Sequence, residues 1–298
     1  MPNVKANGIQ IEYETFGDSS SPPLVLIMGL GGQMIYWDEE LCEKFAKQNL
    51  YVIRFDNRDS GLSQKIEEAG VPDLMKAMEA ALRGEKIKAY YTYDDMADDT
   101  IGLLDVLDIE KAHICGISMG SAITQTIGIR HPSRVLSLIP IMMGTGNPDN
   151  PRPKPEMFAP FITPPPQERG AFSDYFVTIN RMWAGAGFPF NEGWFRRKGG
   201  EAFDRGGLSL EGTARQILAG MAHGNRKPAL ASVTAPTLVI HGSDDPLIHI
   251  DAGKDTAASI PGAELLIIEG MGHELPHGTG AWLKVFDAIV AHTRKVSP

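Results

Sequence analysis

The chain has 298 residues, 43% of them hydrophobic, which is enough to fill the interior of one large α/β domain or of a core with a smaller appendage. Its formal net charge of -9 leaves no surplus of Lys and Arg to neutralise phosphates, so the composition argues against a nucleic-acid partner. No run approaches the roughly 18 apolar residues of a membrane span, and we therefore expect no membrane partner.

The N-terminal sequence and the cysteines bear on the compartment. Residues 1–10 lack the cationic start and the continuous apolar stretch of a secretory signal, so we expect a cytoplasmic protein. Cys115 lies inside an apolar, strand-like run and Cys42 in a charged helical segment. These settings do not indicate a disulfide framework.

Short β-branched or apolar runs alternate with helical stretches along most of the chain. The runs cover residues 9–15, 24–28, 51–56, 112–117, 135–143, 237–241 and 265–269. Such alternation predicts an α/β fold with a mostly parallel sheet covered by helices. Several runs are apolar at consecutive positions, which is typical of strands buried on both faces in the middle of a sheet.

A glycine-rich turn, MGLGG at residues 28–32, directly follows the second of these runs. A turn of this kind can aim a backbone amide at an anionic oxygen, and we expect the N–H of Leu30 to do so. The alternative is that the glycines only form a tight turn between strand and helix. No G-x-x-x-x-G-K-[ST] or G-x-G-x-x-G pattern occurs here, so a phosphate cradle is not indicated.

Ser118 stands at the centre of GISMG, which matches G-x-S-x-G. The apolar run 112–117 precedes it, and a helix-like segment from Met119 to Arg130 follows and stops at Pro132. This order of strand, turn and helix is typical of a nucleophilic serine on a sharp turn. We predict Ser118 as the nucleophile and the N–H of Met119 as a second oxyanion donor, against the alternative of an ordinary helix N-cap.

Two stretches interrupt the alternation of strands and helices. The smaller covers residues 67–91, with helix-forming composition over 73–83. The larger begins Pro-rich, lacks strand patterns and predicts a helical insertion at 144–229 between core segments 1–143 and 230–298. Its aromatic residues either form a small core or line an apolar pocket, and the sequence leaves both roles open. They are Phe158, Phe161, Phe172, Tyr175, Phe176, Trp183, Phe188, Phe190, Trp194, Phe195 and Phe203.

The end of another strand-like run is followed by two candidate acids, Asp244 and Asp245, in the segment HGSDDP at residues 241–246. An acid that orients a catalytic imidazole should lie on a loop at the same sheet edge as the serine. We prefer Asp245, because the proline after it fixes the chain, whereas Asp244 can be solvated or can cap the next turn.

GMGH at residues 270–273 places His273 on a glycine-flanked loop after the last strand run. This setting suits a general base that takes the serine proton. Of the other histidines, His241 ends a strand but adjoins the acid loop, and His277 shares the loop of His273. We predict His273 as the base, and the order of serine, aspartate and histidine is the one expected for α/β-hydrolases.

These motifs together resemble the α/β-hydrolase superfamily: MGLGG, FDNRDSGLS, GISMG, HGSDDP and GMGH. The RDSGLS form and the helical insertion look like the branch that contains aclacinomycin methylesterase. Many relatives have His before the oxyanion glycine and Gly after the arginine of the second motif, where this chain has Met28 and Asp59. The resemblance implies an eight-stranded, mostly parallel sheet, with the insertion as a cap over the active site.

The resemblance further implies an acyl-serine intermediate that water resolves, without a metal or organic cofactor. Relatives with an aspartate nucleophile, the haloalkane dehalogenases and epoxide hydrolases, are disfavoured because Ser118 holds that position. We therefore expect hydrolysis of a small or medium apolar carboxylic ester. Carbon–carbon bond hydrolysis, amide hydrolysis, perhydrolysis and ligand binding without turnover remain alternatives. The oligomeric state, a homodimer included, stays open.

Overall fold

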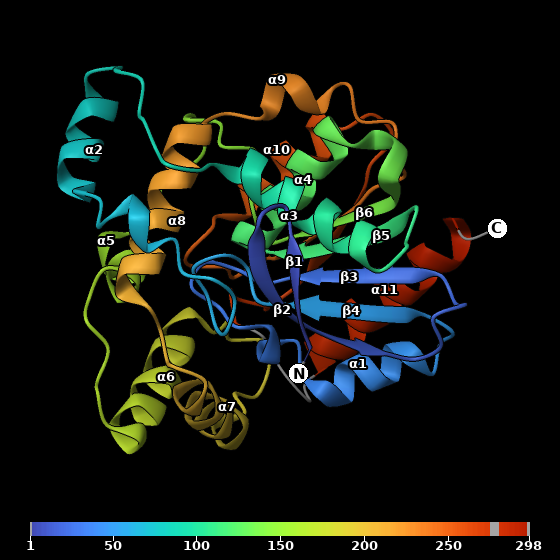
Figure 1. Ribbon diagram of the computed structural model, residues 1–298, viewed down its shortest axis with the longest axis horizontal. Coiled ribbons are helices and arrows are strands. Elements are labelled where there is room, and N and C mark those ends of the chain that lie inside the picture. Colours follow the sequence, from blue (N-terminus) through green and yellow to red (C-terminus); the bar gives the residue numbers. More distant parts are fainter. Residues whose placement is uncertain (1, 275–279, 297–298) are drawn as a thin grey trace.

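An eight-stranded sheet runs through the centre of the molecule in a computed structural model that describes residues 2–274 and 280–296 (Figure 1). The strands are β1 (Asn3–Ala6), β2 (Ile9–Phe16), β3 (Pro23–Ile27), β4 (Tyr51–Phe55), β5 (Ala112–Ile117), β6 (Val135–Ile141), β7 (Leu238–Gly242) and β8 (Glu264–Ile268). Their order in the sheet is β1-β2-β4-β3-β5-β6-β7-β8. Strand β2 is antiparallel to both neighbours and the remaining pairs are parallel, which confirms the predicted mostly parallel sheet.

The sequence patterns located every strand except β1. This strand has four residues and only two apolar side chains, Val4 and Ala6, so it carries too little periodicity to be recognised. It pairs at the edge of the sheet, where Val4 lies opposite Ile11 of β2.

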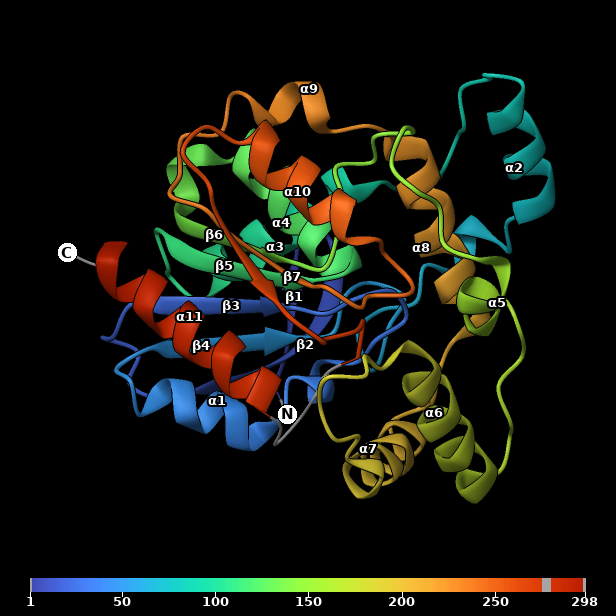
Figure 2. The same cartoon turned by 180° about the vertical axis from the view of Figure 1, so that it is seen from behind.

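Helices cover both faces of the sheet (Figures 1 and 2). One face carries α1 (Glu39–Ala46) and α11 (Gly280–Val296). The other carries α3 (Tyr93–Val106), α4 (Met119–Arg130), α9 (Lys227–Leu230) and α10 (Ile250–Ser259). Short 3₁₀ turns occupy Met34–Tyr36, Glu67–Ala69, Pro132–Arg134 and Ala159–Phe161.

Strand β3 shows why the sheet is buried on both sides. Leu24 and Leu26 belong to the core beneath α1 and α11, while Val25 and Ile27 belong to the core beneath α3 and α4. Successive side chains of a strand point to opposite faces, so a continuous apolar run serves both cores.

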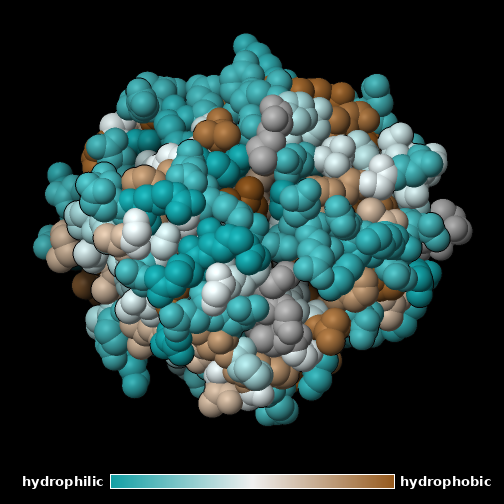
Figure 3. All heavy atoms as spheres, turned by 90° about the horizontal axis from the view of Figure 1, so that it is seen from below, coloured by the Kyte–Doolittle hydropathy of each residue, from teal (hydrophilic) through white to brown (hydrophobic). Residues whose placement is uncertain are grey.

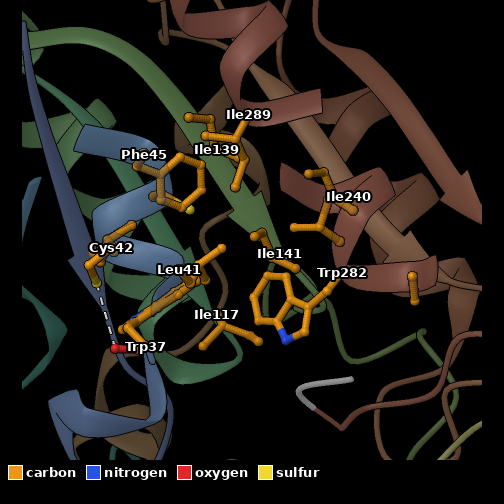
Figure 4. Packing of buried hydrophobic residues seen from close by; sticks show 14 of the residues in the cluster. Trp37, Leu41, Cys42, Phe45, Ile117, Ile139, Ile141, Ile240, Trp282 and Ile289 are labelled. Atoms are coloured by element: carbon orange, nitrogen blue, oxygen red, sulfur yellow. Dashed lines mark hydrogen bonds between the residues drawn. The ribbon is translucent and has the colours of Figure 1, made fainter. Parts of the chain in front are cut away.

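The core beneath α1 and α11 is shown in Figure 4, where Phe45 lies near Ile139 and Ile289, and Trp282 lies near Ile141. Cys42 belongs to this core, and its thiol contacts the backbone oxygen of Trp37 at 3.6 Å (Figure 4). Cys42 and Cys115 are both buried free thiols, in agreement with the expectation of no disulfide.

A helical segment connects β6 to β7. It contains α5 (Pro155–Phe158), α6 (Arg169–Trp183), α7 (Glu192–Asp204) and α8 (Leu210–His223) before α9. These helices lie beyond the carboxyl ends of the strands, as does α2 (Leu74–Leu82) of the smaller insertion (Figure 1). The segment therefore stands over the sheet edge at which the predicted site residues gather.

The outer surface of the protein is largely polar. On the face in Figure 3, hydrophobic side chains show only in small groups among hydrophilic ones. None of the helices in residues 2–274 and 280–296 is both long and apolar enough to span a bilayer.

Candidate active site

Ser118 occupies a sharp turn between β5 and α4, with φ 53° and ψ -122°. Glycine is required on either side of Ser118, because a side chain at either position would collide with the backbone. A Cβ at Gly116 would lie 2.1 Å from the backbone oxygen of Gly120, and a Cβ at Gly120 would lie 2.2 Å from that of Ile27. The Ser118 N–H donates to the backbone oxygen of Ile141 at 2.9 Å, which ties the turn to β6. The local sequence thus holds the hydroxyl above the end of β5.

His273 links the serine to an aspartate. Its Nε2 lies 3.0 Å from Ser118 Oγ, and its Nδ1 lies 2.7 Å from Asp245 Oδ2. The other carboxylate oxygen, Oδ1, accepts the N–H groups of Leu247 and Ile248 at 2.9 and 2.7 Å. Because the carboxylate accepts the Nδ1–H, Nε2 is the nitrogen that can accept a proton from the serine.

The structure separates the two candidate acids. Asp245 is 6% exposed and faces the imidazole. Asp244 is exposed, and its carboxylate accepts a hydrogen bond from the Ser243 hydroxyl at 2.8 Å. The chain therefore brings Asp245, and not Asp244, to His273.

The rival histidines have other surroundings. His241 Nε2 lies 2.8 Å from the backbone oxygen of Ile248 and 3.6 Å from Asp245 Oδ2. Burial lowers the pKa of His241, so its ring is neutral at neutral pH. His113 lies within β5 and contacts a serine of β6. His277 lies outside the described residues.

The glycine-rich turn lies beside the serine. A Cβ at Gly29 would lie 3.1 Å from the Ser118 Cβ. The Gly31 N–H donates to Gln216 Oε1 at 2.8 Å, and the Gly32 N–H donates to the Gly29 oxygen at 3.1 Å. Both amides are therefore engaged inside the protein. Leu30 lines a cavity together with Ser118 and Met119, so the two predicted donor residues border the same cavity as the hydroxyl.

Two cavities meet at Ser118. The first has a volume of about 110 Å³ and also contains His273, Leu30 and most of the aromatic cluster. Its aromatic walls are Tyr36, Phe161, Phe172, Tyr175, Phe176, Trp183, Trp194 and Phe195. The second has a volume of about 320 Å³ and extends along α8 and the loop after β7. Its walls include Met119, Met143, Ile217, Met221, Arg226 and Leu247.

The aromatic cluster of the insertion serves both purposes that the sequence left open. Most of its members line a cavity, whereas Phe188, Phe190 and Phe203 line neither. Phe190 stacks on Phe195 at 4.6 Å between ring centroids and supports the wall from behind.

Acidic residues of the FDNRDSGLS motif hold the insertion against the core. Asp56 pairs with Arg205 at 2.5 Å and Asp59 with Arg215 at 2.6 Å. Asp59 has φ 68°, the left-handed region in which glycine is favoured, and it also accepts the Tyr91 hydroxyl at 2.7 Å. These contacts account for the aspartate in place of the glycine that many relatives have. Sequence reasoning missed both arginines, since nothing in their spacing marks them.

Another contact fastens the insertion to the loop of His273. Glu274 is 4% exposed, and its Oε2 accepts the Gly185 N–H at 3.2 Å. The His273 N–H donates to the Trp183 oxygen at 2.8 Å. Burial raises the pKa of Glu274 to about 7. Sequence reasoning missed Glu274, although a carboxylate directly after the candidate base was a visible signal.

The described residues around Ser118 supply hydrogen-bonding groups to the cavities. Among the described residues, no group of three or more His, Cys, Asp or Glu could hold a metal ion. The arrangement can deliver a hydroxyl nucleophile, take up its proton and exclude water with apolar walls.

Known proteins with similar sequences include esterases. A rhodomycin D methylesterase, DauP, from Streptomyces sp. strain C5 is 28% identical over 98% of this chain and 97% of its own. A 3-oxoadipate enol-lactonase from Acinetobacter baylyi is 25% identical over 89% of this chain and 87% of its own. The match to this methylesterase agrees with the resemblance of the sequence motifs to the branch that contains aclacinomycin methylesterase.

Solved structures and a family model agree on the fold. The structure of a meta-cleavage product hydrolase, CumD, from Pseudomonas fluorescens superposes with a TM-score of 0.76 at 18% identity, covering 100% of this chain and 98% of that one. The family model described as alpha/beta hydrolase fold matches residues 22–277. That match covers most of the chain, including Ser118, Asp245 and His273. The protein therefore belongs to the α/β-hydrolase fold family.

Proposed function

We propose that the protein is a serine hydrolase that cleaves carboxylic esters of small molecules. Ser118 is the nucleophile, His273 the general base and Asp245 the acid that orients it. The observation that carries the proposal is the continuous hydrogen-bonded chain from Ser118 Oγ through both ring nitrogens of His273 to Asp245 Oδ2, at the junction of two apolar cavities. The insertion 144–229 acts as the cap that closes these cavities.

The reaction follows from the positions of the atoms. As Ser118 Oγ attacks the ester carbonyl carbon, its proton passes to Nε2 of His273, and Asp245 stabilises the imidazolium. The carbonyl oxygen becomes an oxyanion, which the N–H groups of Leu30 and Met119 stabilise. The imidazolium then gives its proton to the departing alkoxide, so an alcohol leaves and an acyl-serine remains.

Water completes the cycle by the reverse use of the same groups. His273 takes a proton from water as the hydroxide attacks the acyl carbon, and it then returns that proton to Ser118 Oγ. The carboxylic acid leaves and the serine is restored. These steps need no metal or organic cofactor.

Ester cleavage is favoured over other reactions of such a triad by the named relatives. One is a methylesterase and the other a lactonase, and a lactone is a cyclic ester. The likeness to the meta-cleavage product hydrolase, at 18% identity, concerns the fold alone and does not favour carbon–carbon cleavage.

The test is hydrolysis of p-nitrophenyl esters from acetate to octanoate, with fluorophosphonate labelling located by mass spectrometry. Ser118→Ala should lose both turnover and labelling and keep its melting temperature. Ser121→Ala is the matched control, since Ser121 lies one helical turn further along α4, fully buried and away from both cavities. Turnover that survives in Ser118→Ala would contradict the proposal, and labelling of Ser118 without turnover of any ester would favour a ligand-binding role.

A further inference from the structure

Arg226 lies in the wall of the second cavity, just after the last long helix of the insertion. It is 4% exposed. Its Nε donates to Gln125 Oε1 at 3.0 Å, and its Nη2 donates to the backbone oxygen of Gly144 at 2.8 Å. Both acceptors are neutral, so neither balances the charge of the guanidinium.

Among the described residues, the guanidinium has no acidic partner, since no carboxylate forms an ion pair with Arg226. Its Cζ lies 5.7 Å from the centre of the Tyr93 ring, which bears no charge. Burial lowers the pKa of Arg226 to about 10, which still leaves it a cation at neutral pH. Arg215, equally buried, pairs with Asp59 instead. A buried cation without a counter-ion is costly, and an anion that enters the cavity would relieve that cost.

One nitrogen of Arg226 is left for such an anion. Within the described part of the chain, Nε and Nη2 are engaged by Gln125 and Gly144, and no hydrogen bond of Nη1 is found. Because Arg226 lines the second cavity, an anion bound in that cavity would accept a hydrogen bond from Nη1. The apolar walls around it, such as Ile217 and Leu247, would strengthen its attraction for a carboxylate by excluding water.

We propose that Arg226 binds a carboxylate of the substrate, and that the protein cleaves monoesters of dicarboxylic acids. The inference rests on the proposed serine-esterase function. The free carboxylate lies in the acyl part, because the departing oxygen must lie near His273 Nε2 and His273 lines the first cavity only. The second cavity holds Ser118 and both oxyanion residues, so the acyl chain extends into it towards Arg226.

Kinetics on matched esters test this inference. The anionic substrates are the monoethyl esters of succinic, glutaric, adipic and pimelic acids, and the neutral ones are ethyl esters of unbranched acids with the same number of acyl carbons. The wild type should prefer the best anionic ester about tenfold to a hundredfold in kcat/KM, mainly through KM, as a hydrogen bond to a charged group predicts. The acid with the greatest preference reports the span from Ser118 to Arg226.

Variants of Arg226 distinguish recognition of the substrate carboxylate from a purely structural role of the guanidinium. Arg226→Met should lose the preference, so that kcat/KM falls at least about tenfold further for the anionic esters than for the neutral ones, and Arg226→Lys should keep part of the preference. Lys227→Met is the control, because Lys227 is the next cation along the chain and pairs with Asp255 outside the cavity. Equal losses on anionic and neutral esters in Arg226→Met would mean that the guanidinium only supports Gln125 and Gly144, and would overturn the inference.

Two further outcomes are decisive. A wild type that prefers neutral esters, or esters with the carboxylate on the alcohol part, would also overturn the inference. A second readout does not depend on turnover: glutarate or adipate should raise the melting temperature of Ser118→Ala, and should not raise that of Ser118→Ala combined with Arg226→Met. Dicarboxylate binding without hydrolysis of any ester would support the anion site and reject the esterase proposal.

Discussion

Asp245→Asn is the most informative single change in the proposed triad. Asp245 Oδ1 accepts two backbone N–H groups, from Leu247 and Ile248, and Oδ2 accepts the imidazole Nδ1–H of His273. An asparagine has only one acceptor oxygen. If that oxygen serves the two backbone amides, the NH₂ group faces Nδ1, which must then be unprotonated. The proton moves to Nε2, and the ring can no longer accept one from Ser118.

The expected loss of activity follows from the cost of turning the asparagine side-chain amide so that its oxygen faces Nδ1. Turning it to restore the productive tautomer would leave two N–H groups without an acceptor, one buried and one partly buried, at about 1–3 kcal/mol each. The total of about 2–6 kcal/mol makes the productive form rarer by about 30-fold to 10⁴-fold, at about 1.4 kcal/mol per factor of ten. Loss of the charge that stabilises the imidazolium adds to this. We expect kcat/KM to fall about 10³-fold to 10⁴-fold.

The assay is hydrolysis of p-nitrophenyl butyrate by the wild type, Asp245→Asn and Asp244→Asn, with thermal unfolding of each. Asp244→Asn is the control, because Asp244 is exposed and its carboxylate accepts the neighbouring Ser243 hydroxyl, whereas Asp245 faces His273. The kcat/KM of this control should change less than about threefold. Equal activity of the two variants, or the reverse order, would refute the assignment of the acid.

Three other predictions concern stability. Gly120→Ala should destabilise the fold severely in urea unfolding, because its Cβ would meet a backbone oxygen of β3 at 2.2 Å, whereas Gly170→Ala in α6 meets nothing within 4 Å and should be tolerated. Asp59→Asn should cost about 3–5 kcal/mol by leaving the Arg215 guanidinium buried without its counter-ion, and adding Arg215→Met should recover part of that loss. Glu274 has a folded-state pKa of about 7, above its ordinary value of 4.5, so its ionisation destabilises the fold as the pH rises between these values. Glu274→Gln should accordingly raise the melting temperature more at pH 8 than at pH 5, and an equal change at both pH values would count against a buried carboxyl.

The parts of the molecule that could be predicted from sequence are those that depend on neighbours along the chain. The run before Ser118, its two glycines and the helix after it are contiguous, so the turn was visible as a local pattern. The loops of Asp245 and His273 follow strands in the same way, and parallel strands bring their carboxyl ends to one edge. Local signals at three strand ends were thus enough to anticipate which side chains meet.

The rest depends on contacts between distant segments. Gln216 meets Gly31 across 185 residues, and Arg215 meets Asp59 across 156. No periodicity in α8 distinguishes these polar residues from solvent-exposed ones. Arg226 is a further case, because its burial and its place in the cavity wall exist only once the insertion packs against the core.

The backbone conformation of Ser118 lowers the stability of the fold while it presents the hydroxyl. A non-glycine residue held at φ 53° and ψ -122° carries strain of about 1–3 kcal/mol, which the surrounding structure must offset. Glycine would relax that turn and leave no hydroxyl. A substitution at Ser118 that raised the thermal stability of this protein would therefore remove the hydroxyl. Stabilising substitutions should instead be sought on the surface and at the contacts between the insertion and the core.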